Sequence, residues 1–179
     1  RVARVGYIGR LVLSTFDVAG AFLHVPLVSS VQIVFRMPQD IAHPSAGCWM
    51  EVTKSIYGLK QSNHAFDADL REVILSSGFR STLDPCIYVR RHTPAYVAAH
   101  PDSASDCCIL STHVDDGQVM CTYPPFWTDL LSVLEARYGP VTTHINADSY
   151  AGIGISRNPA GAISLSQRGF ILRLLESVG

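Results

Sequence analysis

The residues best suited to chemistry are three aspartates at two points of the chain. Asp17 directly follows an apolar run, and the pair Asp115-Asp116 lies between two apolar runs at 107–112 and 118–122. Runs of this length bounded by turn residues indicate strands, and the Asp-Gly step between them predicts a hairpin with both acids at its tip. We therefore expect the three carboxylates to converge if their strands are neighbours in one sheet.

Convergent carboxylates have a specific chemical use. Their oxygen atoms are the ligands that hard divalent cations prefer. Two such cations, about 3.5–4 Å apart, are the usual apparatus for in-line attack on a phosphorus centre. An alternative stays open at this point, because Asp and Gly dominate turns for conformational reasons alone. On that interpretation the pair at 115–116 marks only a polar surface turn.

Composition limits the class of protein. The chain has 179 residues, of which 47% are hydrophobic and 16% charged, as expected for one domain or a piece of a larger protein. It has no apolar run of 18 residues and no visible signal peptide, which predicts an intracellular protein, cytoplasmic or nuclear, that is neither secreted nor in a membrane. Its five cysteines include no Cys-x-x-Cys pair, which argues against a zinc ribbon. The net charge of −1 argues against tight nucleic-acid binding by this chain alone.

Hydrophobic periodicity predicts the elements that position the acids. Helices are expected from Asn63, as N-cap, to Gly78, from 126 to 138 before Gly139-Pro140, and after a cap at Ser166. The segment 92–106 is expected to be a loop. Strands are expected over 8–17, 31–36, 48–52, 86–91, the two arms of the hairpin, 150–155 and 163–165. In order, strand, helix, hairpin, helix and strand predict an α+β, ferredoxin-like (split βαβ) fold with an antiparallel sheet and helices packed on one face.

Five sequence blocks, in order, carry a resemblance to a known family. The blocks are Asp17-Val18-Ala19-Gly20-Ala21-Phe22-Leu23, Ser55-Ile56-Tyr57-Gly58-Leu59-Lys60-Gln61, Gly78-Phe79 with Asp84-Pro85-Cys86-Ile87-Tyr88, Val114-Asp115-Asp116, and Leu165-Ser166-Gln167. Over almost the whole chain, the sequence resembles the reverse transcriptase of Ty1/copia-type retrotransposons. Each block alone is weak to moderate support, whereas five in order with similar spacing are strong.

The resemblance implies a single polymerase palm domain over 1–179. The fingers would be largely absent and the thumb absent, with a C-terminal helix at 166–178 leading out of the palm. The opening Arg1-Val2-Ala3-Arg4 is similar to the end of a family segment that precedes the palm. Other domains of a polyprotein are expected in an intact element.

The resemblance also implies which residues carry catalysis. Asp17 and Asp115 would bridge two Mg²⁺ ions, with Mn²⁺ as an alternative, and Asp116 would support them. Val18, directly after the first aspartate, joins these three as a metal ligand. RNA template, DNA primer and deoxynucleoside triphosphates (dNTPs) are the implied partners.

A second set of residues is implied to bind the incoming nucleotide. Val18, Gly20 and Ala21 match backbone positions that hold the triphosphate, and Phe22 matches a bulky gate that excludes a ribose 2′-hydroxyl. Gln61, expected just before a helix, matches a contact to the sugar and the template base. The alternatives are that Phe22 is a core aromatic and that Gln61 only caps a loop.

Two departures keep other functions open. His113 stands where the family has a tyrosine beside the acids, and the regions outside the palm are missing. The histidine would either alter primer seating, add a positive charge below about pH 6.5, or be only a packed strand residue. The chain is then either a polymerase palm or a catalytically inactive, truncated remnant that acts only as a folded interaction domain. A third alternative, another metal-dependent nucleotidyl-transfer palm such as a cyclase, is opposed by the Tyr57-to-Gln61 block.

Overall fold

The computed structural model describes residues 11–27, 29–150, 152–159 and 161–178. The predictions for the opening segment 1–4 and for the start of the strand at 8–17 lie outside these residues. The strands are β1 (Val12–Val18), β2 (Val34–Arg36), β3 (Trp49–Glu51), β4 (Arg80–Ser81), β5 (Ile87–Arg91), β6 (Cys107–His113), β7 (Asp116–Cys121), β8 (Val141–Ile145), β9 (Ser149–Tyr150), β10 (Ile153–Arg157) and β11 (Ile163–Ser166). The helices are α1 (Lys60–Ser76), α2 (Pro94–Ala99), α3 (Pro124–Tyr138) and α4 (Arg168–Val178), with 3-10 turns η1 (Ala21–His24) and η2 (Pro101–Ser103).

One antiparallel sheet organises the molecule. Its six strands lie in the order β4-β5-β6-β7-β1-β8, and every neighbouring pair is antiparallel. Six of the elements, β1, α1, β6, β7, α3 and β8, follow one another as strand, helix, strand, strand, helix, strand, with β2 and β3 inserted before α1, and β4, β5 and α2 between α1 and β6. The fold is therefore mixed α and β with antiparallel sheets, while its assignment to a ferredoxin-like polymerase palm stays a prediction.

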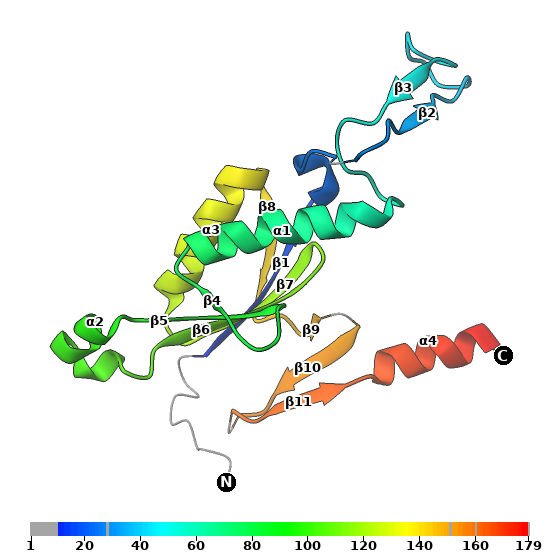
Figure 1. Cartoon of the computed structure of the whole chain (residues 1–179). Coiled ribbons are helices and arrows are strands. Elements are labelled where there is room, and N and C mark those ends of the chain that lie inside the picture. Colours follow the sequence, from blue (N-terminus) through cyan, green and yellow to red (C-terminus); the bar gives the residue numbers. More distant parts are fainter. Residues whose placement is uncertain (1–10, 28, 151, 160, 179) are drawn as a thin grey trace.

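Helices α1 and α3 cover one face of this sheet (Figure 1). Alternate residues of β1, Phe16 and Val18, point to that face and are 1% exposed. They pack in one cluster with apolar residues of the two helices, including Phe66, Leu70, Ile74, Leu130 and Leu134. Each such side chain contributes roughly 1.5–3 kcal/mol when fully buried. The helices thus hold β1 and β7, the two strands that carry the acids.

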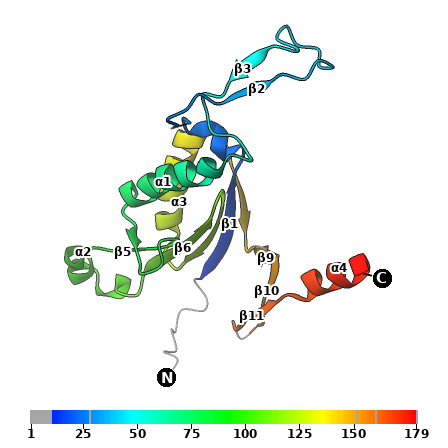
Figure 2. The ribbon, with the colours of Figure 1, turned by 45° about the vertical axis from the view of Figure 1, so that its right-hand side comes forward.

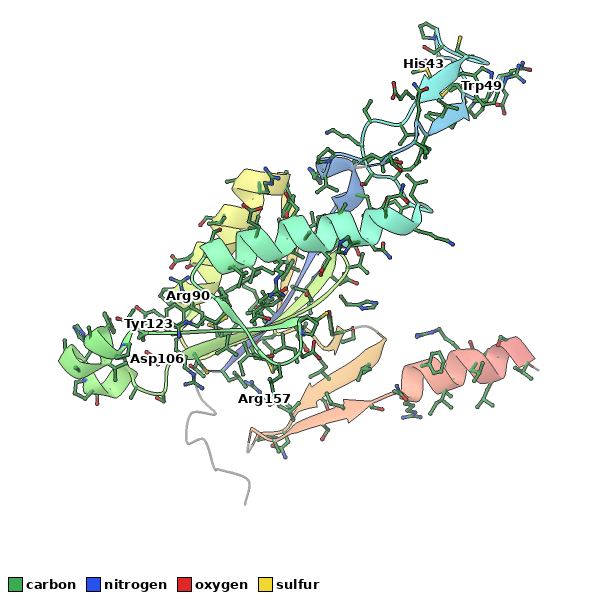
Figure 3. All side chains as sticks on the ribbon, viewed as in Figure 1. His43, Trp49, Arg90, Asp106, Tyr123 and Arg157 are labelled. Atoms are coloured by element: carbon green, nitrogen blue, oxygen red, sulfur yellow. The ribbon has the colours of Figure 1, made fainter. Side chains whose placement is uncertain are left out.

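The opposite face of the sheet is more open. The small sheet β11-β10-β9 lies on this side and leads to α4 (Figure 2). Apolar residues of α4 are exposed, among them Phe170 and Leu174. The hairpin of β2 and β3 projects from the end of the molecule opposite α2, with His43 and Trp49 in its outer part (Figure 3). Within the described ranges, no helix combines the length and apolarity needed to cross a membrane.

The start of α1 differs from the prediction. Asn63 is not the N-cap, since the helix already begins at Lys60 after an extended Leu59. Gly58 has a φ of 95°, and the Ser62 hydroxyl donates a hydrogen bond to the Ile56 carbonyl at 2.7 Å, so the chain turns into the helix earlier. The predicted end holds, because Ser77 and Gly78, with a φ of 83°, close the helix.

Two other segments were wrongly predicted. The supposed loop 92–106 contains α2 and η2, because Thr93 accepts a hydrogen bond from the Tyr96 amide and Pro94 occupies the first helical turn. The predicted strand 150–155 is two strands, β9 and β10, which turn near Gly152 with its φ of 78°. Neither belongs to the main sheet, whose last strand is β8.

Strand β8 is rich in β-branched residues but lies at an exposed edge of the sheet. Its sequence therefore lacks the clear apolar alternation of a half-buried strand.

Candidate active site

The acidic pair lies at the tight connection between β6 and β7. His113 pairs with Asp116, so the turn consists of Val114 and Asp115. The predicted Asp-Gly turn is therefore displaced: Asp116 already belongs to β7, and Gly117 lies inside that strand. A Cβ atom on Gly117 would be 2.0 Å from Cε1 of Phe16, so this glycine is required by close packing and not by the turn.

The turn is conformationally strained. Val114 has a φ of 57°, which is rare for a β-branched residue. Its side chain packs against the core cluster, and the next carbonyl, of Asp115, accepts a hydrogen bond from the Val18 amide at 3.2 Å. Strained backbone persists only where its surroundings hold it, and it clusters at functional sites. The packing of Val114 and the hydrogen bond from the Val18 amide thus fix the backbone position of Asp115.

Four residues from four neighbouring strands form a row on the open face of the sheet. Asp17 pairs with Asp116 of β7 and with Thr142 of β8, and Asp116 pairs with His113 of β6. Paired residues share a face of an antiparallel sheet, and this face is opposite to that of Phe16 and Val18. The structure thus brings Asp17 beside the acidic pair, with Asp116 rather than Asp115 as its direct partner.

The acids influence one another electrostatically. Burial raises the pKa of Asp17 above its usual value, and the charges of Asp115 and Asp116 raise that pKa further. Neighbouring negative charges disfavour ionisation, and a cation between them removes this penalty. In its chemistry, the donor set therefore fits a divalent cation such as Mg²⁺.

The side chains are not yet gathered around one point. Within the part of the chain that the structure describes, no three His, Cys, Asp or Glu residues are placed to hold a metal ion together. Instead, Oδ2 of Asp115 accepts a hydrogen bond of 3.0 Å from the Tyr57 hydroxyl. This bond is the main cause of the raised pKa of Tyr57. The three aspartates thus lie on adjoining elements without forming a gathered metal-binding group.

Tyr57 is the site residue that sequence analysis missed. It begins the Tyr-Gly-Leu-Lys-Gln block, from which only Gln61 was assigned a role. An exposed large aromatic within a recognised motif was the available signal. Its ring is 62% exposed and meets the ring of Phe22 edge-on, with 4.5 Å between centroids.

The nucleotide-binding candidates lie on two elements next to the acids. Gly20 adopts a left-handed conformation with a φ of 64° and opens η1, which carries Ala21 and Phe22. Val18, Ala21 and Phe22 are at most 3% exposed, so all three are buried beside the acids, and their contact with a nucleotide stays a prediction. For Phe22 the structure shows the core aromatic, packed between Tyr57 and Phe66, and its role as a gate stays a prediction.

Gln61 was expected just before a helix, but it lies in the first turn of α1. Its side chain is half-buried. It therefore does not simply cap a loop, and its contact with a nucleotide stays a prediction.

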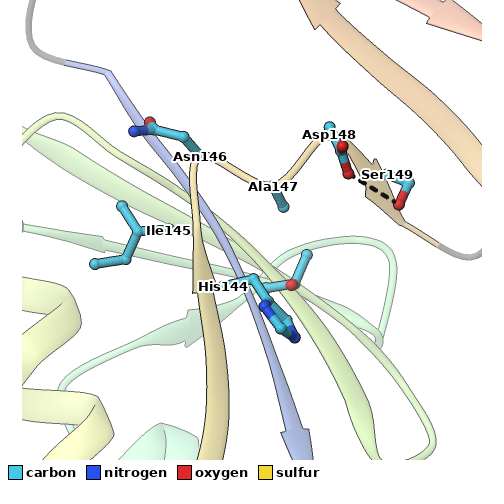
Figure 4. A pocket seen from close by; sticks show the side chains of 7 residues that line it. His144, Ile145, Asn146, Ala147, Asp148 and Ser149 are labelled. Atoms are coloured by element: carbon cyan, nitrogen blue, oxygen red, sulfur yellow. Dashed lines mark hydrogen bonds between the residues drawn. The ribbon is translucent and has the colours of Figure 1, made fainter.

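One hollow borders Asp17 and Asp116, and a second hollow adjoins the first. One, of about 230 Å³, is lined by Asp17 and Asp116 together with His144 and Tyr150. The other, of about 400 Å³, shares Thr15, His144 and Ser149 with the first and extends along Asn146 and Asp148 (Figure 4). The open face beside the acids thus has room for a ligand between the two sheets.

Comparison with known proteins supports a retroelement origin. No protein-family model matches the chain. Over 160 residues, 89% of its length, the chain is 29% identical to the "Retrovirus-related Pol polyprotein from transposon RE1" of Arabidopsis thaliana. The match covers only 10% of that polyprotein. The chain is therefore similar to a region of a retrotransposon Pol polyprotein, and the predicted resemblance is confirmed at that level.

Proposed function

We propose that this chain is the palm of an RNA-directed DNA polymerase from a Ty1/copia-type retroelement, with a ferredoxin-like fold. The observation that carries the proposal is the direct pairing of Asp17 with Asp116, next to Asp115 in the turn, on the face of the sheet opposite α1 and α3. Similarity to a retrotransposon Pol polyprotein over most of the chain supports the same function. A polar surface turn alone would not need a third aspartate from another strand.

In the proposed site, the three aspartates form the metal-binding element. Asp17, Asp115 and Asp116 would hold two Mg²⁺ or Mn²⁺ ions, together with the backbone of Val18. Bound there, the ions supply a lowered pKa for the primer 3′-hydroxyl and neutralise the triphosphate. The chain's own part is to hold these carboxylates at fixed positions, through the β1–β7 ladder and the hydrogen bond from the Val18 amide to the Asp115 carbonyl.

The proposed substrates are a DNA primer on an RNA template and dNTPs. Gly20 and Ala21, where β1 passes into η1, would present backbone amides to the triphosphate. Gln61 and Phe22 would contact the sugar of the nucleotide. Other domains of a polyprotein would supply further contacts to nucleic acid, as expected for a chain of net charge −1.

A second candidate function is a folded, catalytically inactive remnant. Two observations favour it: among the described residues no three acids form a metal-holding group, and Asp115 accepts a hydrogen bond from Tyr57 instead. In that case the acids survive only as polar residues of a surface turn.

Primer extension distinguishes the two functions. We expect the chain, joined to the fingers and thumb of a Ty1/copia-type reverse transcriptase, to extend a DNA primer on an RNA template with Mg²⁺ or Mn²⁺, and Asp17→Asn or Asp115→Asn to abolish extension while the circular dichroism spectrum is unchanged. The matched control is Asp102→Asn, an exposed aspartate of η2 near the opposite end of β6. No extension by the unaltered chain supports the remnant. Extension by Asp17→Asn at the original rate contradicts the proposed site.

A further inference from the structure

Tyr57 joins two parts of the site that are far apart in sequence. Its hydroxyl donates to Oδ2 of Asp115 at 3.0 Å, across 58 positions of the chain. Its ring meets Phe22, which is 3% exposed, with 4.5 Å between the ring centroids. One exposed side chain thus contacts both an implied metal ligand and the implied sugar gate.

The backbone that carries Tyr57 is held in place on both sides. Before it, the amide of the fully buried Ser55 donates to the Val25 carbonyl at 3.1 Å. On its other side, the Ser62 hydroxyl of α1 donates to the Ile56 carbonyl at 2.7 Å. The position of the Tyr57 backbone is therefore set by the core, and its long side chain reaches the turn from a fixed base.

While Asp115 accepts the hydrogen bond from Tyr57, the three carboxylates do not form a group that could hold a metal ion. Asp115 sits on a turn whose backbone is fixed by Val114 and by the bond to β1, so the freedom that remains lies in its side chain. In the orientation that satisfies Tyr57, no three acidic or other metal-binding residues of the described chain share one point. The hydrogen bond occupies Oδ2 of Asp115, and turning this carboxylate away from Tyr57 is a movement that the fixed backbone still allows.

We propose that Tyr57 is a positioning residue that holds the Asp115 carboxylate away from Asp17 and Asp116 until a divalent cation draws that carboxylate toward them. This inference rests on the proposed function, since it concerns the loading of that same site. Release of Asp115 frees the Tyr57 ring, whose movement then exposes the edge of Phe22 to a bound nucleotide. The hydroxyl thus opposes cation binding, and its removal strengthens binding.

The test is the affinity for Mn²⁺, measured from the loss of the electron paramagnetic resonance signal of the free ion. We expect Tyr57→Phe to bind Mn²⁺ about fivefold more tightly than the unaltered chain, as loss of one opposing hydrogen bond implies. Tyr96→Phe is the matched control, because it removes a partly exposed hydroxyl from α2, and should leave the affinity unchanged. Asp17→Asn should abolish binding in both backgrounds.

The outcomes separate this inference from the proposed function. If the unaltered chain binds Mn²⁺ through Asp17 and Tyr57→Phe binds equally or more weakly, the restraint by Tyr57 is wrong while the metal site stands. If neither the unaltered chain nor Tyr57→Phe binds Mn²⁺, both the metal site and the inference are wrong. Because Tyr57 is largely exposed, the phenylalanine variant should fold, and circular dichroism verifies this.

Discussion

Substitution of Gly117 by alanine should strongly destabilise the protein, because the space for a methyl group is already filled. A Cβ at Gly117 would lie 2.0, 2.2 and 2.8 Å from three atoms of the Phe16 ring. That ring is 1% exposed and packs beside Trp127, with 5.7 Å between centroids, so it has little room to move. Overpacking a core typically costs about 1–3 kcal/mol, and we expect the upper end, about 3 kcal/mol.

This cost is measurable as a double-mutant cycle in urea. Gly117→Ala should lower the unfolding midpoint with an unchanged slope, which indicates a loss of stability rather than of two-state behaviour. In a Phe16→Ala background the same change should cost less than about 1 kcal/mol, since the clashing ring is gone. Gly154→Ala in β10 is the matched control, because its Cβ would meet only the Ser166 carbonyl at 3.4 Å.

A small cost of Gly117→Ala, or one that does not depend on Phe16, would refute the clash between this position and the Phe16 ring. If Gly117→Ala costs less than about 0.5 kcal/mol, or costs the same with and without the Phe16 ring, the close packing of β7 on β1 is wrong. The direct pairing of Asp17 with Asp116 would then lose its support, since both pairs belong to the same register.

Two further predictions concern pH. Burial acts to raise the pKa of Asp69, but hydrogen bonds from Arg137 and Tyr138 lower it, and the net pKa is below the usual value. A lowered carboxyl pKa adds stability above pH 3.8, the usual pKa, and that stability is lost as pH falls through the pKa of the folded state. Asp69→Asn should therefore lower the free energy of unfolding at pH 7 by about 1–3 kcal/mol, seen as a lower thermal midpoint, and the difference in thermal midpoint between variant and unaltered protein should be smaller below pH 3. The pKa of Asp17 is raised, first by burial and then by Asp115 and Asp116, so its contribution is favourable below pH 3.8 and is lost as pH rises through the folded value. Asp17→Asn should accordingly raise the thermal midpoint at pH 7 without cations and change it little at pH 3; an equal shift at both pH values would contradict the repulsion between the acids.

The parts of the fold that sequence could predict are those with strong periodicity. The apolar positions of α1 and α3 repeat every three or four residues and end at Gly78 and Gly139, and both helices are observed with these ends. The two strands of the hairpin and the apolar run before Asp17 were likewise recognisable. These segments bury one face, so their pattern reports their structure directly.

The features that the sequence did not predict depend on contacts with residues elsewhere in the chain. The hairpin turn moved to Val114-Asp115 because Gly117 is needed opposite Phe16, which no local rule for turns contains. Strand β8 is an exposed edge with no apolar alternation, and it was recognisable only by its β-branched residues. The role of Tyr57 depends on Asp115, 58 positions away, so it emerged only in three dimensions.

A crystal structure of the chain with Mn²⁺, in which anomalous scattering locates the ion, tests the proposed metal site most directly. We expect a peak about 2.1 Å from carboxylate oxygens of Asp17 and of at least one acid of the pair, with Asp115 released from Tyr57. A peak elsewhere, or an unchanged bond between Tyr57 and Asp115 with no ion beside Asp17 at saturating Mn²⁺, would contradict it.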